Sequence, residues 1–476
     1  MKKSLLILCF ILPAMKIFGQ QFSQYNTGTL YDSFENPSQR SFIPDSSRQL
    51  ASNFFIPNFG ANFYVKGNAQ NVLMNRLFAG YYNTADLSIG AGKYSNIRSS
   101  ANSYWAMLKI FTSLNGNQEI GFSASTRAET NGYLTDESLA IFNGYLNFPN
   151  NNYTNVLNSR YDYQVYHQFS FSYREQVTPR FALGVKLSAL LGLAYSQVDI
   201  RQSQVNFDKQ NDSARIALQG ISRESNRLKS FTIKNPGLAV SIGAGTTTRD
   251  GFRLQFNLKD LGVIHWGGDS YSAAFDRDTT LGGVSTGKRE TNLFNAVANI
   301  ISTNKRSTGF YTKTNAIAEV SVNRSYWLDY NRHFKFAPTV IASKELYYNG
   351  VTGALVAPIS YDNYTATFTT SYNIIGLFNF GGQVMYKTPN AEVYLGTERL
   401  VQTGRSILTA ARNNNDYPQV AGAIRQYSGA DIFLGVSFKF GNVIEHPMNA
   451  SVIPDGEKGF FSKFLGKIFK GKDKNY

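Results

Sequence analysis

The chain has little of the chemistry on which most enzymes and metalloproteins depend. Of its 476 residues one is cysteine, four are histidine and three are tryptophan, and charged residues make up only 17%. A single cysteine excludes a disulfide scaffold and excludes zinc or iron–sulfur sites built on several thiolates. The histidines fall into no recognised ligand spacing, and no Ser/His/Asp grouping appears at plausible spacing. We therefore predict a non-enzymatic protein that uses no cofactor and no metal.

Long apolar runs are also missing beyond the first twenty residues, which excludes a membrane protein that spans with helices. The start of the chain has a basic Met1-Lys2-Lys3, an apolar Leu5–Met15 and a small Gly19 ahead of a Gln-Gln pair. This pattern predicts a secretory signal peptide over residues 1–19. Cys9 lies in the middle of the apolar run rather than after it, so we expect it to be removed with the signal and not to carry a lipid.

What the chain does have is aromatic residues, 14% of the total, and a period-two alternation. Tyr161–Arg174 alternates apolar and polar positions over 14 residues, and Phe181–Ser196 does so over 16. Successive side chains of a strand point to opposite faces, so each stretch has one apolar and one polar face. The pattern recurs in Leu238–Gly245, Phe252–Lys259, Ala316–Val322, Phe334–Ala342, Tyr364–Tyr372, Phe378–Tyr386 and Ile432–Phe440.

Strand length separates the two architectures that such alternation allows, a soluble sandwich and a membrane barrel. Soluble strands have about five or six residues. Fourteen residues at about 3.3 Å each and about 40° of tilt rise roughly 35 Å, enough to cross an apolar band of about 25 Å. We therefore predict an all-β fold, a transmembrane antiparallel β-barrel of about 14 strands with a range of 12 to 16. Lys186, Arg253 and Lys259 are expected to face its lumen and make it electropositive.

The predicted organisation has four parts: the signal peptide at 1–19, a short periplasmic N-terminal segment at 20–48, the barrel at 49–441 and a periplasmic tail at 442–476. The longest connections, Gly132–Ser159, Gln202–Pro236, Gly267–Arg306 and Gln402–Ser428, are expected outside the cell. An even number of crossings then leaves both termini in the periplasm. The predicted location is the outer membrane of a Gram-negative cell.

Several short motifs resemble those of the FadL family of outer-membrane channels. They are Asn36-Pro37-Ser38 ahead of the strand expected at Ser52–Val65, Leu258-Lys259-Asp260-Leu261-Gly262, Tyr394-Leu395-Gly396-Thr397-Glu398 and the closing stretch Ala430–Gly441. The chain most resembles an uncharacterised FadL-like group of Bacteroidota that is related to barrels of the type IX secretion system. The resemblance implies a 14-stranded channel for hydrophobic compounds. Residues 20–35 depart from the family because they lack the glycine-rich stretch that plugs typical FadL channels, so the family's gating route is not expected from this part of the chain.

The C-terminal tail has a helical pattern. Phe460, Phe461, Phe464, Leu465, Ile468 and Phe469 fill one half of a helix, and Lys463, Lys467 and Lys470 fall on the opposite half. We predict a basic amphipathic helix at which these nine residues dock on the membrane or on a partner protein. The expected partners are outer-membrane lipid and, through the tail and the long loops, other outer-membrane or periplasmic proteins. Nucleic acid is not expected.

Two functions follow from these observations. The first, implied by the family resemblance, is transport of small hydrophobic compounds across the outer membrane. The second is a structural subunit of a multi-protein outer-membrane complex for protein secretion or outer-membrane protein assembly, which the long loops and the tail favour.

Overall fold

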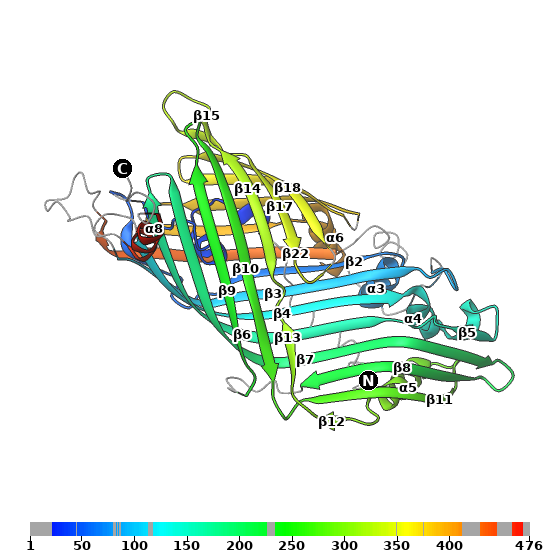
Figure 1. Ribbon diagram of the computed structural model, residues 1–476. Helices are drawn as coiled ribbons and strands as arrows, with labels where there is room; N and C mark the ends of the chain where they lie inside the picture. Colours follow the sequence, from blue (N-terminus) through cyan, green and yellow to red (C-terminus); the bar gives the residue numbers. More distant parts are fainter. Residues whose placement is uncertain are drawn as a thin grey trace.

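The computed structural model describes residues 21–43, 45–79, 82, 84, 87–112, 118–225, 234–348, 350–374, 376–411, 429–444 and 459–469. In this part of the chain the main element is a single sheet that closes on itself (Figure 1). Its strands are β1 (Arg48–Ser52), β2 (Asn58–Lys66), β3 (Tyr94–Phe111), β4 (Gln118–Thr135), β5 (Asn152–Thr154), β6 (Arg160–Thr178), β7 (Phe181–Asp208), β8 (Ser213–Ser225), β9 (Pro236–Thr247), β10 (Phe252–Trp266), β11 (Tyr271–Gly282), β12 (Arg306–Ser307), β13 (Phe310–Lys313), β14 (Ile317–Arg324), β15 (Tyr326–Trp327), β16 (Phe334–Phe336), β17 (Thr339–Glu345), β18 (Val351–Tyr361), β19 (Tyr364–Asn373), β20 (Leu377–Lys387), β21 (Ala391–Thr397) and β22 (Gly429–Val443).

Helices occupy the segments between and ahead of these strands. They are η2 (Phe22–Gln24), α2 (Leu30–Glu35), α3 (Ala69–Ala79), α4 (Asp136–Ala140), η3 (Ile141–Asn147), α5 (Arg289–Ile301), α6 (Leu400–Ala411) and α8 (Phe460–Phe469). Within the residues described above, no helix combines the length and apolar character needed to cross a membrane.

The sheet is a closed antiparallel barrel. β22 pairs with β21 on one side and with β1 and β2 on the other, and β1 and β2 both pair with β3. Sixteen of the strands have seven residues or more. Fourteen strand positions lie in the closed circuit, while β8 and β11 extend from the far half of β7. The predicted fold class is confirmed, and the two strands beyond the preferred fourteen are those of this extension.

The two faces of the wall follow the alternation in the sequence. On β6 and β7, Phe171 and Leu187 point outward and remain 39% and 54% exposed, whereas the neighbouring Arg174 and Lys186 point inward and are buried. Phe122, Phe171 and Leu187 are register partners across three strands and form an apolar row on the outside. Such an outward apolar face is typical of a barrel that contacts lipid.

The two ends of the barrel differ (Figure 1). One end has the short turns at 179–180, 248–251, 362–363 and 388–390, together with α8. The other end has α3, α4, α5 and α6 and the extension of β7, β8 and β11. Two of the connections that were expected to be loops, Gln202–Pro236 and Gly267–Arg306, therefore contain long strands. α5 and η3 cover one face of the extension with an apolar core that includes Phe148, Ile216 and Phe275.

The N-terminal segment lies inside the barrel. Over residues 21–47, which we call the plug, most described side chains are buried, and Leu30, Phe34 and Phe42 are fully buried against the inner wall. The N-terminal segment predicted in the periplasm at 20–48 therefore lies, over its described residues, within the barrel. A sequence this rich in small polar residues resembles an exposed loop, but here the same residues match a lumen that is itself polar.

Candidate functional site

The plug is held by ion pairs that are buried inside the barrel. Its helix α2 begins where the Thr29 side chain accepts a hydrogen bond from the backbone N–H of Asp32 at 3.2 Å, a side-chain cap. The helix ends at Glu35, whose carboxylate lies 3.0 Å from the guanidinium of Arg127 on β4. Arg127 also contacts Asp260 of β10 at 2.7 Å. One guanidinium of β4 therefore joins the plug to β10, and the three side chains are only 4–14% exposed.

Lysines complete this buried cluster. Lys259 lies 3.1 Å from Glu319 and 3.6 Å from Glu35, and Lys186 lies 3.2 Å from Asp260. Lys186 and Lys259 thus face the lumen as predicted. Nearby carboxylates neutralise the charges of these two lysines. The lumen therefore does not have the expected excess of positive charge around them.

Further hydrogen bonds fasten the plug along its length. The backbone N–H of Ser23 donates to Glu398 at 2.7 Å and that of Leu30 donates to Glu392 at 2.9 Å. Toward the other end, Arg174 donates through Nε to the carbonyl oxygen of Ser38 at 2.9 Å. Beside the plug the lumen retains two polar spaces of about 100 Å³ each. Each space is large enough to hold water.

Glycines on the inner face of the wall let the plug come close. A Cβ atom added to Gly184 of β7 would lie 2.0 Å from the carbonyl oxygen of Pro37, and one added to Gly121 would lie 3.0 Å from the ring of Phe34. Gly60 and Gly243 stand in similar contact with Gln21 and Asn36. These strand glycines mark where backbone or side-chain atoms of the plug come closest to the wall.

Changing Gly184 to alanine is expected to destabilise the docked plug by about 1–3 kcal/mol, the usual cost of overpacking a close contact. The added methyl group would meet the backbone of Pro37, which has no rotamer with which to move aside. The matched control is Gly353→Ala on β18, where no atom lies within 4 Å of the new Cβ. Thermal unfolding of both variants in detergent checks the prediction, and equal melting temperatures would contradict it.

The wall itself is interrupted between β1 and β2. Residues 53–57, which we call the wall break, leave the sheet, so the continuous strand expected at Ser52–Val65 is wrong over its first part. Ser52 pairs with Leu108 and Asn58 with Tyr104, so five residues stand opposite three on β3. Phe54 and Phe55 adopt positive φ angles of 47° and 62° and remain exposed. The physical cause is Pro57, which cannot donate a ladder hydrogen bond.

Two buried asparagines replace the backbone hydrogen bonds that the break removes. Asn53 accepts from the N–H of Met107 at 2.8 Å and donates to the carbonyl oxygen of Tyr104 at 3.1 Å. Asn58 replaces one such bond on β22, where it accepts from the N–H of Val436 at 2.8 Å. At the wall break, side-chain amides thus form hydrogen bonds to backbone groups that a continuous strand would otherwise bind.

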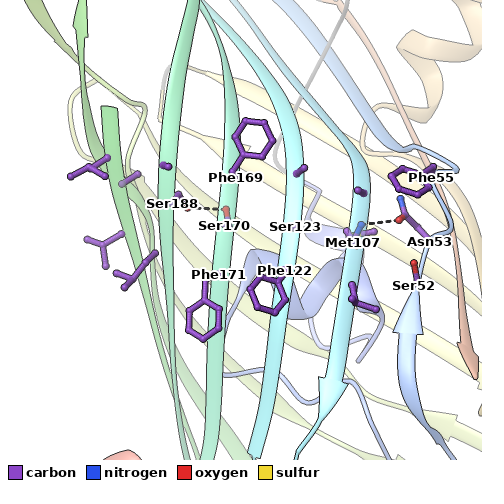
Figure 2. Close-up of a pocket in the computed structure, with 18 of the residues that line it drawn as sticks. Ser52, Asn53, Phe55, Met107, Phe122, Ser123, Phe169, Ser170, Phe171 and Ser188 are labelled. Carbon is purple, nitrogen blue, oxygen red and sulfur yellow. Dashed lines mark hydrogen bonds between the residues drawn. The ribbon is translucent and has the colours of Figure 1, made fainter. Parts of the chain in front are cut away.

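Beside the wall break the outer face carries an apolar groove of about 1000 Å³ (Figure 2). It crosses β3, β4, β6, β7 and β9 and is bordered by Phe55 of the break. On its inner side the wall has a row of small residues, in which Ser123 pairs with Ser170 and Ser170 with Ser188. Met107 lines the groove and also belongs to the buried cluster that contains Phe34 of the plug. The groove and the plug therefore lie on either side of one thin part of the wall.

The predicted tail residues are brought together only in part. Phe460, Phe461, Lys463, Phe464, Leu465 and Lys467 lie on α8, which packs against β6. Ile468 and Phe469 belong to the same helix, and Lys470 lies outside the described residues. The plug and the wall break were missed by the sequence analysis, although Pro57 inside a predicted strand was a usable signal for the break.

Within the described ranges, no three His, Cys, Asp or Glu side chains are placed to hold a metal ion. His167 contacts the hydroxyl of Thr126 at 3.0 Å and lies edge-on to Phe169. His333 contacts Asp362 at 2.6 Å at the short-turn end, and this hydrogen bond raises the pKa of its imidazole. His446 lies outside the described residues.

Comparison with solved structures finds outer-membrane barrels of low sequence identity. A FadL homologue of Pseudomonas aeruginosa is 11% identical over 88% of this chain and 96% of its own, with a TM-score of 0.41. The toluene transporter TodX of Pseudomonas putida is 10% identical over 86% and 93%, with a TM-score of 0.38. The translocator domain of the autotransporter NalP from Neisseria meningitidis is 9% identical over 83% and 90%, with a TM-score of 0.32.

A search of the curated proteins gives no match. One family model matches residues 47–398, a span that includes the wall from near the start of β1 to the end of β21 and makes up more than half of the chain. The chain therefore belongs to this family, which is described as a family of unknown function (DUF5723).

Proposed function

We propose that this barrel resides in the outer membrane, with both termini on the periplasmic side, and that it transports small hydrophobic compounds without catalysing a reaction. The observation that carries the proposal is the groove of about 1000 Å³ on the outer wall, lined mainly by apolar side chains, beside the wall break. A pocket of this size and character suits a small apolar guest. Its position at the lipid-facing surface places such a guest next to hydrocarbon.

The plug supports a gated route rather than an open pore. Only one thin part of the wall separates the groove from the plug, and the ion pair and hydrogen bonds that join the plug to the wall can be exchanged for bonds to water. A compound that passes from the groove into the lumen requires the plug to shift. Transport in this proposal is therefore coupled to the buried ion pairs around Arg127.

Filling the groove tests the proposal. Ala189 lies exposed on the groove floor, and Ala189→Trp would occupy the space with an indole ring. We expect cells that produce this variant to take up the fluorescent hydrophobic probe 1-N-phenylnaphthylamine at the rate of cells without the protein. Val340→Trp is the matched control, because Val340 is 59% exposed on the outer face of β17 and does not line the groove. Equal uptake by A189W and the unchanged protein would count against transport through the groove.

A second candidate is a structural subunit of a multi-protein outer-membrane complex for protein secretion or assembly. The extension of β7, β8 and β11 favours it, because this sheet continues beyond the barrel and has its own apolar core with α5. Native mass spectrometry of the detergent-extracted protein separates the two candidates. Stoichiometric protein partners support the subunit, and a free barrel with bound lipid supports transport.

A further inference from the structure

Helix α8 packs against β6 at the end of the barrel with the short turns (Figure 1). Arg174 of β6 points into the lumen, where it reaches Ser38, so the next residue, Glu175, points outward. The backbone N–H groups of Phe461 and Ser462 donate to the two oxygens of the Glu175 carboxylate at 2.7 and 2.9 Å. The helix therefore lies on the surface that faces lipid higher up the same strand.

The contacts between the start of α8 and β6 involve particular side chains of both segments. Tyr173 donates to Glu175 at 2.9 Å, accepts from the N–H of Phe460 at 3.2 Å and has its ring 5.5 Å from that of Phe461. A Cβ atom added to Gly459 would lie 2.4 Å from the carboxyl carbon of Glu175, so the close approach requires glycine at that position. A bare carboxylate on the outer wall would be costly near hydrocarbon, and the helix N-terminus supplies the hydrogen bonds and partial positive charge that it needs.

The side of α8 turned away from the barrel is aromatic and basic. Phe460 and Phe464 are 66% and 53% exposed, and their rings stack nearly parallel with centroids 6.4 Å apart. Lys463 and Lys467 are also exposed. They lie one residue before and three residues after Phe464, and therefore next to the aromatic side chains. Four residues above Glu175 on the same face of β6, about 13 Å along the strand, stands the lipid-facing Phe171. The helix is thus level with the margin of the apolar band.

We propose that α8 is an interfacial helix that binds anionic phospholipid. Phe460 and Phe464 insert into the leaflet beside the barrel, and Lys463 and Lys467 contact the headgroup phosphates. Glu175 fixes the helix to the wall, so the barrel and the leaflet hold opposite sides of one helix. The occupant is lipid rather than protein because the exposed rings continue the outer surface of the wall at the edge of its apolar band.

A fluorescent probe at position 464 tests the proposal on the full chain. Cys9 is the only cysteine of the sequence, so Phe464→Cys in a Cys9→Ser background gives one attachment site for an NBD dye. In vesicles of phosphatidylcholine and phosphatidylglycerol we expect a blue-shifted emission and loss of most of the fluorescence to nitroxide-labelled lipids. The loss should be greater with the nitroxide near the headgroup than deep in the chain. A probe at Tyr330→Cys, a fully exposed residue between β15 and β16, should keep its fluorescence.

Two further sets of variants test the preference for anionic lipid and the attachment of α8 to Glu175. Lys463→Glu with Lys467→Glu should abolish the stronger quenching in mixed vesicles over pure phosphatidylcholine, and equal quenching of the unchanged helix in both would overturn the anionic assignment. Glu175→Gln should lower the anisotropy of the probe because the cap is weakened. A probe at position 464 that stays unquenched in every vesicle overturns lipid binding. Lipid binding is also overturned if the probe is unquenched in vesicles but shielded from solvent in native membranes, since that result indicates a protein partner. None of these outcomes depends on the proposed transport.

Discussion

Replacing Arg127 with methionine is expected to release the plug from the barrel. The guanidinium is the shared partner of Glu35 in the plug and Asp260 in the wall, at 3.0 and 2.7 Å. Methionine fills similar volume but leaves two buried carboxylates without that cation. Removing one partner of a buried pair typically costs about 3–5 kcal/mol, which here favours the undocked plug by roughly a hundredfold to several thousandfold.

The measurement is the rate at which a buried plug residue becomes accessible. Ser33 is fully buried on α2, so Ser33→Cys in a Cys9→Ser background reacts with a membrane-impermeant maleimide only when the plug leaves its place. The labelling rate should rise with the undocked population. Lys186 and Lys259 still contact Asp260 and Glu35 in the variant, so the barrel wall is expected to remain folded.

The matched control for this variant is Arg215→Met. Arg215 pairs with Asp278 across β8 and β11, but their side chains are 61% and 44% exposed. An exposed pair of this kind contributes about 1 kcal/mol at most, so the labelling rate of the thiol introduced by Ser33→Cys should not change. Equal labelling in R127M and R215M would mean that the buried cluster does not hold the plug.

The wall of this barrel was predictable because its information is local. β7 begins at Phe181 and β6 covers Arg160–Thr178, close to the alternating stretches at Phe181–Ser196 and Tyr161–Arg174. β7 continues to Asp208 past two shifts in register, one opposite Val165 and Tyr166 of β6 and one between Ile200 and Gln202. A bulge moves every later side chain to the other face, so a strict period-two pattern ends there although the strand does not.

The plug was not predictable because its partners are far away in the sequence. Glu35 and Arg127 are 92 residues apart, and Ser23 and Glu398 are 375 apart. The plug itself has no period that distinguishes a buried polar segment from an exposed one. A weaker signal was present in the wall, where lysines and carboxylates fall on the face that should be the lumen. Charges at those positions require partners, and the plug provides part of them.

Replacing Asn53 with leucine is expected to destabilise the barrel at the wall break. The Asn53 side chain is fully buried, and it hydrogen-bonds to the N–H of Met107 and to the carbonyl oxygen of Tyr104 beside the residues that leave the sheet. Leucine has a similar size but can neither accept nor donate. Each buried backbone group left without a partner costs about 1–3 kcal/mol, so the two together should cost roughly 2–6 kcal/mol. That is a large part of the usual stability of a folded domain, about 5–15 kcal/mol.

Urea unfolding in lipid vesicles, followed by tryptophan fluorescence, measures this loss. Trp105 sits on β3 directly between Tyr104 and Ala106, where the pairing with β4 shifts register, and its ring meets Phe169 edge-on. It therefore reports on the wall next to the break. Asn292→Leu is the matched control, because Asn292 on α5 makes one exposed bond to the carbonyl oxygen of Gly282 and should cost about 1 kcal/mol or less. An unchanged urea midpoint in N53L would show that water already satisfies the two groups, and the break would then be an opening in the wall rather than a sealed join.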